Sequence, residues 1–185
     1  MEKVKIPECE KGDWKIKIVI PDRTDWSSLK QGREVPLGEP ITILTRNGEL
    51  VMSDTPAEQR DHYSALFRAE GSCLLNGLGI GMLLKNILLK PEVTDVTVVE
   101  ISQDLIDLVS PYYTDPRVTI VCANAFDYQP PKGKKYNMVW HDIWDTICAS
   151  NLPEMTKLHR KYGKRTTWQG SWCKDRCLSA RSRVW

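Results

Sequence analysis

The sequence has no apolar run close to the roughly 20 residues that a membrane-spanning helix needs. Its charged N-terminus also lacks the apolar core of a signal peptide. The six cysteines show no CxxC spacing, which argues against the common zinc motifs. These absences predict a cytoplasmic protein with no membrane partner, no metal, and cysteines that are reduced and structural.

The chain also has no large excess of one sign of charge, since the formal net charge is only +2. This value is too small to indicate a membrane or nucleic-acid partner by itself, so we expect no nucleic-acid partner. The basic residues are concentrated late, between Lys157 and Arg183. That skew leaves an anionic partner open, although a solvated surface is the favoured interpretation. The length of 185 residues allows one core with an appended piece.

The first 70 residues predict a small region of strands, a hairpin and a helix. Residues 14–20 alternate as a half-buried strand does, after an extended lead-in over 1–13. Two further apolar runs, 41–45 and 49–52, flank an Asn-Gly hairpin signal, and residues 21–39 read as an irregular connection. Thr55, Pro56 and Glu58 predict a helix start, with the helix running to about Ala69 and ended by Gly71.

From residue 71 the pattern alternates between strands and helices. We expect strands at 73–76, 95–101, 117–122, 136–141 and 164–169, and helices at 81–90, 102–110 and 153–162. Such alternation predicts an α/β fold with a doubly wound, mostly parallel, Rossmann-like sheet over residues 71–185. Ligands of these sheets bind at the carboxyl ends of the strands.

Three glycines follow the first of these strands, at positions 77, 79 and 81, and Glu100 stands at the end of the next. Glycines allow a ligand close to the backbone, and a carboxylate at that strand end can accept hydrogen bonds from ribose hydroxyls. The pattern predicts a nucleoside site. A plain tight turn is the alternative, because packed turns also use glycine.

The order of these landmarks resembles the class I S-adenosylmethionine-dependent methyltransferase superfamily, and most closely its spermidine-synthase-like (polyamine aminopropyltransferase) branch. The residues that carry the resemblance lie within about 40–150: the glycine loop, Val98-Val99-Glu100-Ile101, Asp115-Pro116-Arg117-Val118, and Tyr136 to Asp142 with the DxxD of Asp142 and Asp145. Glu58 and His62 match a Glu and a His on the helix that precedes the domain in that branch.

The resemblance implies S-adenosylmethionine, or its decarboxylated form, as the cofactor. The residues implied to bind it are Gly77, Gly79 and Gly81 at the methionine part, Glu100 with Ile101 at the ribose, and Asn124 with Ala125 beside the adenine. Asp142 would orient an attacking amine and accept its proton, with Asp145 either contacting substrate or capping a turn. The implied substrate-side residues are Glu58, His62 and Trp144. His141 should point to the opposite side of its strand.

Two departures weaken the polyamine reading. Aminopropyltransferases carry an acid in the glycine loop, where this chain has Ile80, and Asp61 stands at a tyrosine position beside the helical His. We therefore expect a methyltransferase acting on an N or O nucleophile, with a small-molecule or amine substrate. The alternatives are an aminopropyltransferase and a non-catalytic nucleoside-binding module. The short C-terminal part leaves the sheet truncated or completed by a second copy in a homodimer.

Overall fold

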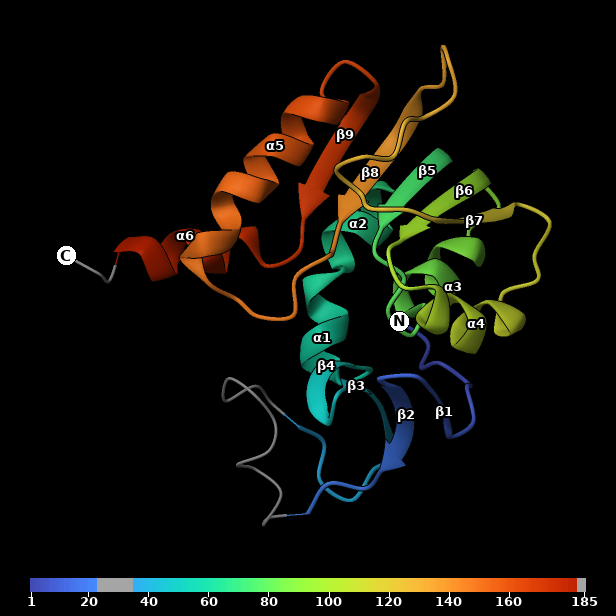
Figure 1. Cartoon of the computed structure of the whole chain (residues 1–185), viewed down its shortest axis with the longest axis vertical. Coiled ribbons are helices and arrows are strands. Elements are labelled where there is room, and N and C mark those ends of the chain that lie inside the picture. The colour runs from blue at the N-terminus through green and yellow to red at the C-terminus, as the bar shows by residue number, and fades with distance from the viewer. Residues whose placement is uncertain (23–34, 183–185) are drawn as a thin grey trace.

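The computed structural model describes residues 1–22 and 35–182, which form two sheets joined by helices (Figure 1). Part of the predicted irregular connection, residues 23–34, lies outside the described residues. Within the described ranges, no helix is long and apolar enough to cross a membrane.

The N-terminal sheet is antiparallel and follows the chain order β1-β2-β3-β4. Its strands are β1 (Cys9–Lys11), β2 (Trp14–Val19), β3 (Ile41–Arg46) and β4 (Glu49–Ser53). The hairpin prediction is confirmed, because Asn47 and Gly48 both have the positive φ that this turn requires, 51° and 80°. The extended lead-in was only partly right, since β1 pairs with β2 and is too short and polar to show a strand pattern.

The predicted helix over 55–69 is two helices, α1 (Pro56–Asp61) and α2 (Tyr63–Arg68). Thr55 caps α1 as expected. The interruption is at His62, whose ring Nδ1 lies 2.8 Å from the Glu58 carbonyl oxygen, while its backbone N–H donates to Gln59 instead. The side chain thus takes the carbonyl that the helix ladder would use. Gly71 then begins a strand and does not end the helix directly.

The second sheet is parallel, with the order β7-β6-β5-β8-β9. Its strands are β5 (Gly71–Asn76), β6 (Val93–Glu100), β7 (Val118–Cys122), β8 (Tyr136–His141) and β9 (Thr166–Ser171). The helices between them are α3 (Met82–Leu88), α4 (Gln103–Val109) and α5 (Leu152–Tyr162), with short 3-10 turns η3 (Ser110–Tyr112) and η4 (Ala149–Asn151). The predicted α/β class and doubly wound parallel sheet are confirmed.

Helices cover both faces of this sheet. One hydrophobic cluster joins α2, α3 and α4 to residues of the N-terminal sheet, including Trp14, Ile16 and Leu44. The other lies under α5, where Leu158 and Tyr162 pack on Leu74 and Val139. A last helix, α6 (Lys174–Ser182), packs against η4 and α5. The sequence did not predict α6, because it has few apolar residues at helical spacing.

The chain winds outward from β5 through β6 to β7, then returns to place β8 on the other side of β5. The carboxyl ends of β5 and β8 therefore meet at the switch point, where ligands of such sheets bind. The backbone N–H of Asp142 donates to the Asn76 carbonyl oxygen at 2.8 Å. This contact places the glycine loop directly beside Asp142.

Candidate active site

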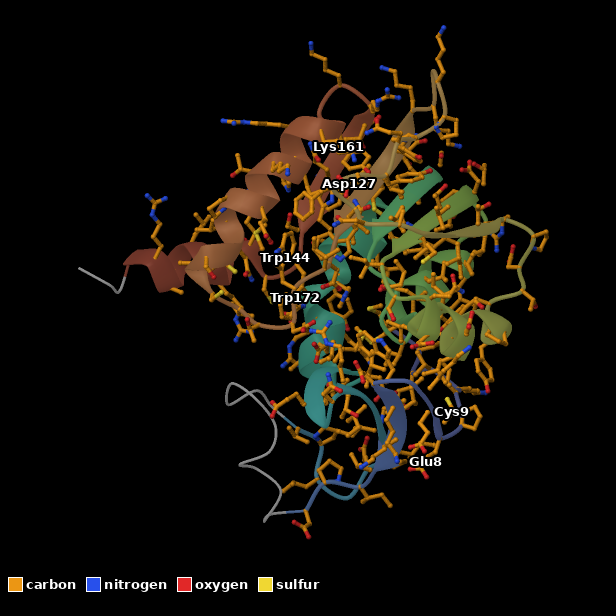
Figure 2. The ribbon with its side chains drawn as sticks, in the orientation of Figure 1. Glu8, Cys9, Asp127, Trp144, Lys161 and Trp172 are labelled. Atoms are coloured by element: carbon orange, nitrogen blue, oxygen red, sulfur yellow. The ribbon has the colours of Figure 1, made fainter. Side chains whose placement is uncertain are left out.

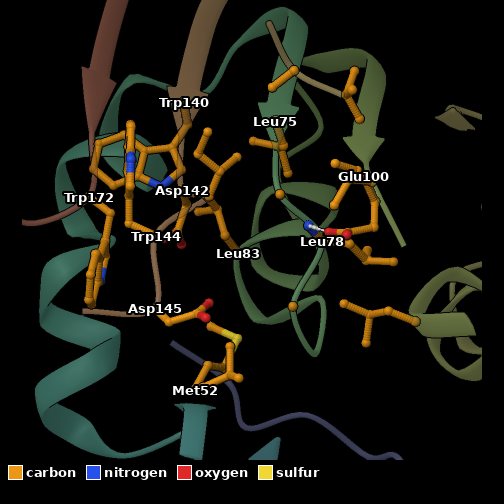
Figure 3. A pocket seen from close by; sticks show the side chains of 18 of the residues that line it. Met52, Leu75, Leu78, Leu83, Glu100, Trp140, Asp142, Trp144, Asp145 and Trp172 are labelled. Carbon is orange, nitrogen blue, oxygen red and sulfur yellow. Dashed lines mark hydrogen bonds between the residues drawn. The ribbon is translucent and has the colours of Figure 1, made fainter. Parts of the chain in front are cut away.

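A cavity of about 310 Å³ lies between the carboxyl ends of the parallel strands and the N-terminal sheet (Figure 3). Glu100 lies on one side of it, and Asp142 and Trp144 on the other. The predicted site residues that line it are Glu58, His62, Gly77, Gly79, Glu100, Ile101, Asn124, Ala125, Asp142, Trp144 and Asp145. The fold thus brings eleven of the twelve predicted residues to one space.

The glycine loop has little room for side chains. Gly77 has a φ of +103°, and a Cβ there would collide with the Asp142 carbonyl oxygen. A Cβ at Gly79 would collide with the Met52 sulfur. Gly81 does not line the cavity; it lies against the Tyr113 ring, whose hydroxyl donates to the Ile80 carbonyl at 2.8 Å. Gly81 therefore serves the packing of the loop.

We predict that Gly77→Ala costs at least about 2 kcal/mol more free energy of unfolding than Gly133→Ala. Gly133 is the matched control, because its φ of +80° is also positive but a Cβ there meets nothing within 4 Å. Comparing the two variants separates the cost of the collision from the cost of backbone strain. Urea denaturation measures the free energy of unfolding of each variant. Equal losses of unfolding free energy in the two variants would show that the structure relaxes around Asp142 without cost, and would contradict the prediction.

Glu100 ends β6 with its side chain 7% exposed and both carboxylate oxygens engaged by backbone donors. Oε2 accepts from the Leu78 N–H at 3.0 Å, and Oε1 accepts from the Ser102 N–H at 2.9 Å. These bonds fix the carboxylate between the glycine loop and the start of α4. Each oxygen keeps a lone pair that can accept a ligand hydroxyl.

The loop after β7 forms another wall through Asn124, Ala125 and Phe126. The Asn124 Oδ1 accepts from the Phe126 N–H at 2.9 Å, so this oxygen, which was expected to face the adenine, is used within the loop. From α5, Lys161 Nζ donates to the carbonyls of Ala125 and Phe126 at 3.1 and 2.8 Å. Figure 2 shows Lys161 beside Asp127 of the same loop. The loop is held by α5.

Asp142 is paired with His62, whose side chain is only 1% exposed. His62 Nε2 lies 2.8 Å from Asp142 Oδ2, and Nδ1 lies 2.8 Å from the Glu58 carbonyl oxygen. Since both partners are acceptors, both ring nitrogens must carry hydrogen for both bonds to form. The pair therefore holds an imidazolium against a carboxylate, and leaves Asp142 Oδ1 for a ligand.

The pKa of His62 reflects this pairing. Burial disfavours the charged ring, but the hydrogen bond to Asp142 and the attraction of that carboxylate outweigh burial and raise the pKa above its ordinary value. A raised pKa in the folded state adds stability below the unfolded value of about 6.5, and this stability is lost as pH rises through the folded pKa.

We expect the stability difference between the wild type and His62→Gln to be largest near pH 6 and to shrink above the raised pKa. His159→Gln is the control with opposite sign, since burial lowers the pKa of His159 and its charging destabilises the fold at low pH. Urea unfolding at several pH values measures both. A gap for His62→Gln that does not change with pH would contradict the imidazolium–carboxylate pair.

The other predicted acids are also engaged. Asp145 forms an ion pair with Arg46 of β3, which in turn lies over the Trp14 ring at 5.2 Å. The Ser53 hydroxyl donates to the Glu58 carboxylate at 2.9 Å. Asp142 is thus the predicted acid that is paired with a buried histidine at the end of β8, whereas Asp145 joins the loop after β8 to the N-terminal sheet.

Several lining residues were not predicted as site residues. Trp14, Arg46 and Met52 come from the N-terminal sheet, and Trp172 from the end of β9. Nothing in their local patterns distinguishes them from core residues. Glu154 of α5 also lines the cavity and accepts a bond of 2.7 Å from Trp144 Nε1. They add two tryptophans, a methionine, one acid and one base to the lining.

His141 lies on the opposite side of β8, as predicted. Its ring is fully buried, packs 5.6 Å from Tyr162, and bonds to Asn76 at 2.8 Å and Gln169 at 3.2 Å. Burial lowers the pKa of His141 to about 3, so the ring is neutral. From β8 it connects β5 and β9, and it does not line the cavity.

Ile80, which stands where aminopropyltransferases carry an acid, is fully buried in the core and does not line the cavity. Its side chain would not reach a ligand. The residues of the loop that face the cavity are Gly77, Leu78 and Gly79. None of these three residues is acidic. The loop that faces the cavity therefore lacks the acid of aminopropyltransferases, but the residue at position 80 is not the reason.

No protein-family model and no curated protein sequence matches this chain. Among solved structures, the spermidine synthase from Thermotoga maritima matches 95% of this chain with a TM-score of 0.57 and 14% identity. This chain spans 63% of that one.

Two methyltransferase structures give lower scores. The 23S rRNA methyltransferase ErmE matches 60% of this chain and 43% of its own, with a TM-score of 0.45 and 17% identity. The N-methyltransferase NodS from Bradyrhizobium japonicum, in complex with S-adenosyl-L-homocysteine, matches 62% of this chain and 59% of its own, at 0.47 and 14%. The match to spermidine synthase shows that the chain has a spermidine-synthase-like α/β fold.

Proposed function

We propose that this chain is an S-adenosylmethionine-dependent transferase that moves a methyl group to an N or O nucleophile, with an amine favoured. One observation carries the proposal: Glu100 and Asp142, at the carboxyl ends of β6 and β8, face the same cavity from opposite sides. A nucleoside held at Glu100 would direct its other end toward Asp142.

The residues present fit the cofactor. Glu100 offers fixed acceptors for ribose hydroxyls, and Gly77 and Gly79 line the cavity beside it without side chains of their own. The loop at Asn124 and Ala125 offers an amide and an apolar wall to a base. When bound, S-adenosylmethionine supplies a methyl group activated by a positively charged sulfur.

The acceptor side fits a cationic or amine ligand. Four carboxylates line it, at Glu58, Asp142, Asp145 and Glu154, together with Trp140 and Trp144. Acidic and aromatic groups attract cations, the latter through the ring quadrupole.

Asp142 is the proton acceptor in this proposal. With the cofactor bound, Asp142 would orient the acceptor nitrogen toward the methyl group and would accept one N–H proton at Oδ1 as the nitrogen is methylated and the sulfonium becomes a neutral thioether. His62 bonds to the other carboxylate oxygen, Oδ2, and keeps Asp142 oriented. Proton acceptance by a positioned carboxylate is the chemistry that this geometry supports.

Aminopropyl transfer from decarboxylated S-adenosylmethionine is the second candidate. Among the described lining residues the cationic side chains are Arg46 and His62, and both are paired with carboxylates, Asp145 and Asp142. The carboxylate of intact S-adenosylmethionine would therefore find no uncommitted cation there. This observation favours a ligand without that carboxylate.

Calorimetric titration with both forms of the cofactor distinguishes the candidates. Tighter binding of S-adenosylmethionine, with a product mass increased by a methyl group on an amine, supports methyl transfer. Preference for the decarboxylated form, with an added aminopropyl group, supports the second candidate. Binding without turnover against amine, nucleic-acid and protein pools would indicate the non-catalytic module.

A further inference from the structure

The small net charge of the chain conceals a strong separation of charge. Residues 152–182, which contain α5, β9 and α6, have eight basic and two acidic residues, while residues 1–151 have 17 basic and 22 acidic. The C-terminal part is strongly basic and the part that carries most of the cavity is acidic.

The two groups of basic residues also differ in their pairing. Eight basic side chains before residue 152 lie within 4.0 Å of a carboxylate oxygen, among them Lys3, Arg46, Lys90 and Arg117. Within the described residues, the basic side chains of 152–182 make no such ion pair. Their charge is not neutralised by the fold.

On α5 the basic residues form a row. Lys157, Arg160 and Lys161 lie on α5 with the spacing i, i+3, i+4, on the side away from the buried Met155, and Lys164 follows just beyond the end of the helix at Tyr162. Arg160 and Lys161 lie in the last turn of α5, where a positive charge also complements the helix dipole, but this effect does not account for Lys157 or for Arg176 near the start of α6. Lys157, Arg160 and Lys164 are exposed, while Lys161 turns toward the loop after β7.

The row starts at the cavity. Glu154, one turn before Lys157, lines the cavity and bonds to Trp144. Figure 2 shows Trp144 and Trp172 near the N-terminal end of α5. Trp172 is buried, so the half-buried Trp144 is the ring that a base could reach at this end of the row. Proteins hold single-stranded nucleic acid with positive charge along the backbone and aromatic rings beside the bases.

The same features disfavour a lipid bilayer. Helices that lie in a membrane surface expose a wide apolar face. The apolar residues of α5, including Leu158 and Tyr162, are buried in the core, and no large hydrophobic side chain is exposed between 152 and 165. In α6, Leu178 is the exposed one.

From this charge separation, the unpaired basic row and its position at the cavity, we infer that α5 and α6 form a docking surface for single-stranded nucleic acid. The phosphate backbone would lie along Arg160 and Lys164 and continue to Arg176 on α6. This inference concerns binding and does not require the proposed transferase activity.

Fluorescence anisotropy of the full chain with a labelled single-stranded RNA of about 20 nucleotides, and with DNA of the same sequence, tests the inference. We expect binding that weakens with salt. The triple variant Arg160→Gln, Lys164→Gln and Arg176→Gln should bind at least tenfold more weakly, and its slope of log affinity against log salt should fall by up to about 2. None of the three residues lines the cavity.

The control removes three exposed charges elsewhere, by Lys5→Gln, Lys17→Gln and Lys132→Gln. It should retain most of the affinity. Cofactor titration and thermal unfolding of both variants confirm that the fold and cavity are intact. Absence of binding at low salt, equal losses in the two triple variants, or binding to phosphatidylserine vesicles but to neither oligonucleotide would each overturn the inference.

Discussion

Replacing Asp142 with asparagine should lower turnover of an accepted amine by about 100-fold or more, the range expected for removal of a positioned proton acceptor. Asparagine has nearly the same shape, and its carbonyl oxygen can still accept a bond from His62 Nε2. The packing of the pair is therefore retained while the basic oxygen is lost. The measurement is the initial rate of S-adenosylhomocysteine or methylthioadenosine formation at saturating cofactor.

Two variants make this result specific. Asp175→Asn removes an exposed acid on α6 that does not line the cavity, and should leave the rate unchanged. Asp145→Asn removes the acid that is paired with Arg46, and should reduce the rate less than Asp142→Asn does. Full activity of Asp142→Asn would remove Asp142 from the chemistry, and a larger loss from Asp145→Asn would transfer the role to that residue.

Replacing Glu100 with glutamine should weaken cofactor binding by about 10- to 100-fold, because hydrogen bonds to a charged acceptor contribute about 1.5–3 kcal/mol each. One end of the glutamine amide is a donor, so it cannot accept from Leu78, Ser102 and the ribose together. Isothermal titration with S-adenosylhomocysteine measures the change.

Discrimination between nucleosides assigns the loss to the ribose. The wild type should prefer adenosine to 2′,3′-dideoxyadenosine, and Glu100→Gln should lose most of that preference. Glu92→Gln is the control, since Glu92 is an exposed acid just before the other end of β6. If Glu100→Gln keeps the preference for adenosine, the carboxylate does not contact the ribose.

The parts of this site that the sequence predicts are those set by the parallel sheet. Gly77, Glu100 and Asp142 each follow a strand, and parallel strands bring their carboxyl ends to one edge. Their position could therefore be derived from local patterns and chain order. The pairing of Asp142 with His62 could not, because it depends on how the junction between α1 and α2 lies against the end of β8, 80 residues later in the chain.

The remaining walls come from long-range packing that has no local signal. Met52 and Arg46 reach the cavity because the N-terminal sheet packs against the glycine loop and against Asp145. In the sequence Gly81 continues the pattern of Gly77 and Gly79, but in the structure it packs on Tyr113. The sequence of α6 is mostly polar and shows no amphipathic pattern, so the helix could not be predicted from it. The helix packs against η4 and α5. The boundary between residues 1–70 and 71–185 remains a prediction.

The central claim is that a nucleoside sulfonium lies between Glu100 and Asp142. A crystal structure of the protein soaked with S-adenosylhomocysteine tests this claim most directly. We predict density over Gly77 and Gly79, with both ribose hydroxyls within hydrogen-bond distance of Glu100 and the sulfur facing Asp142. Density for the ligand elsewhere, or a ribose turned away from Glu100, would contradict the account.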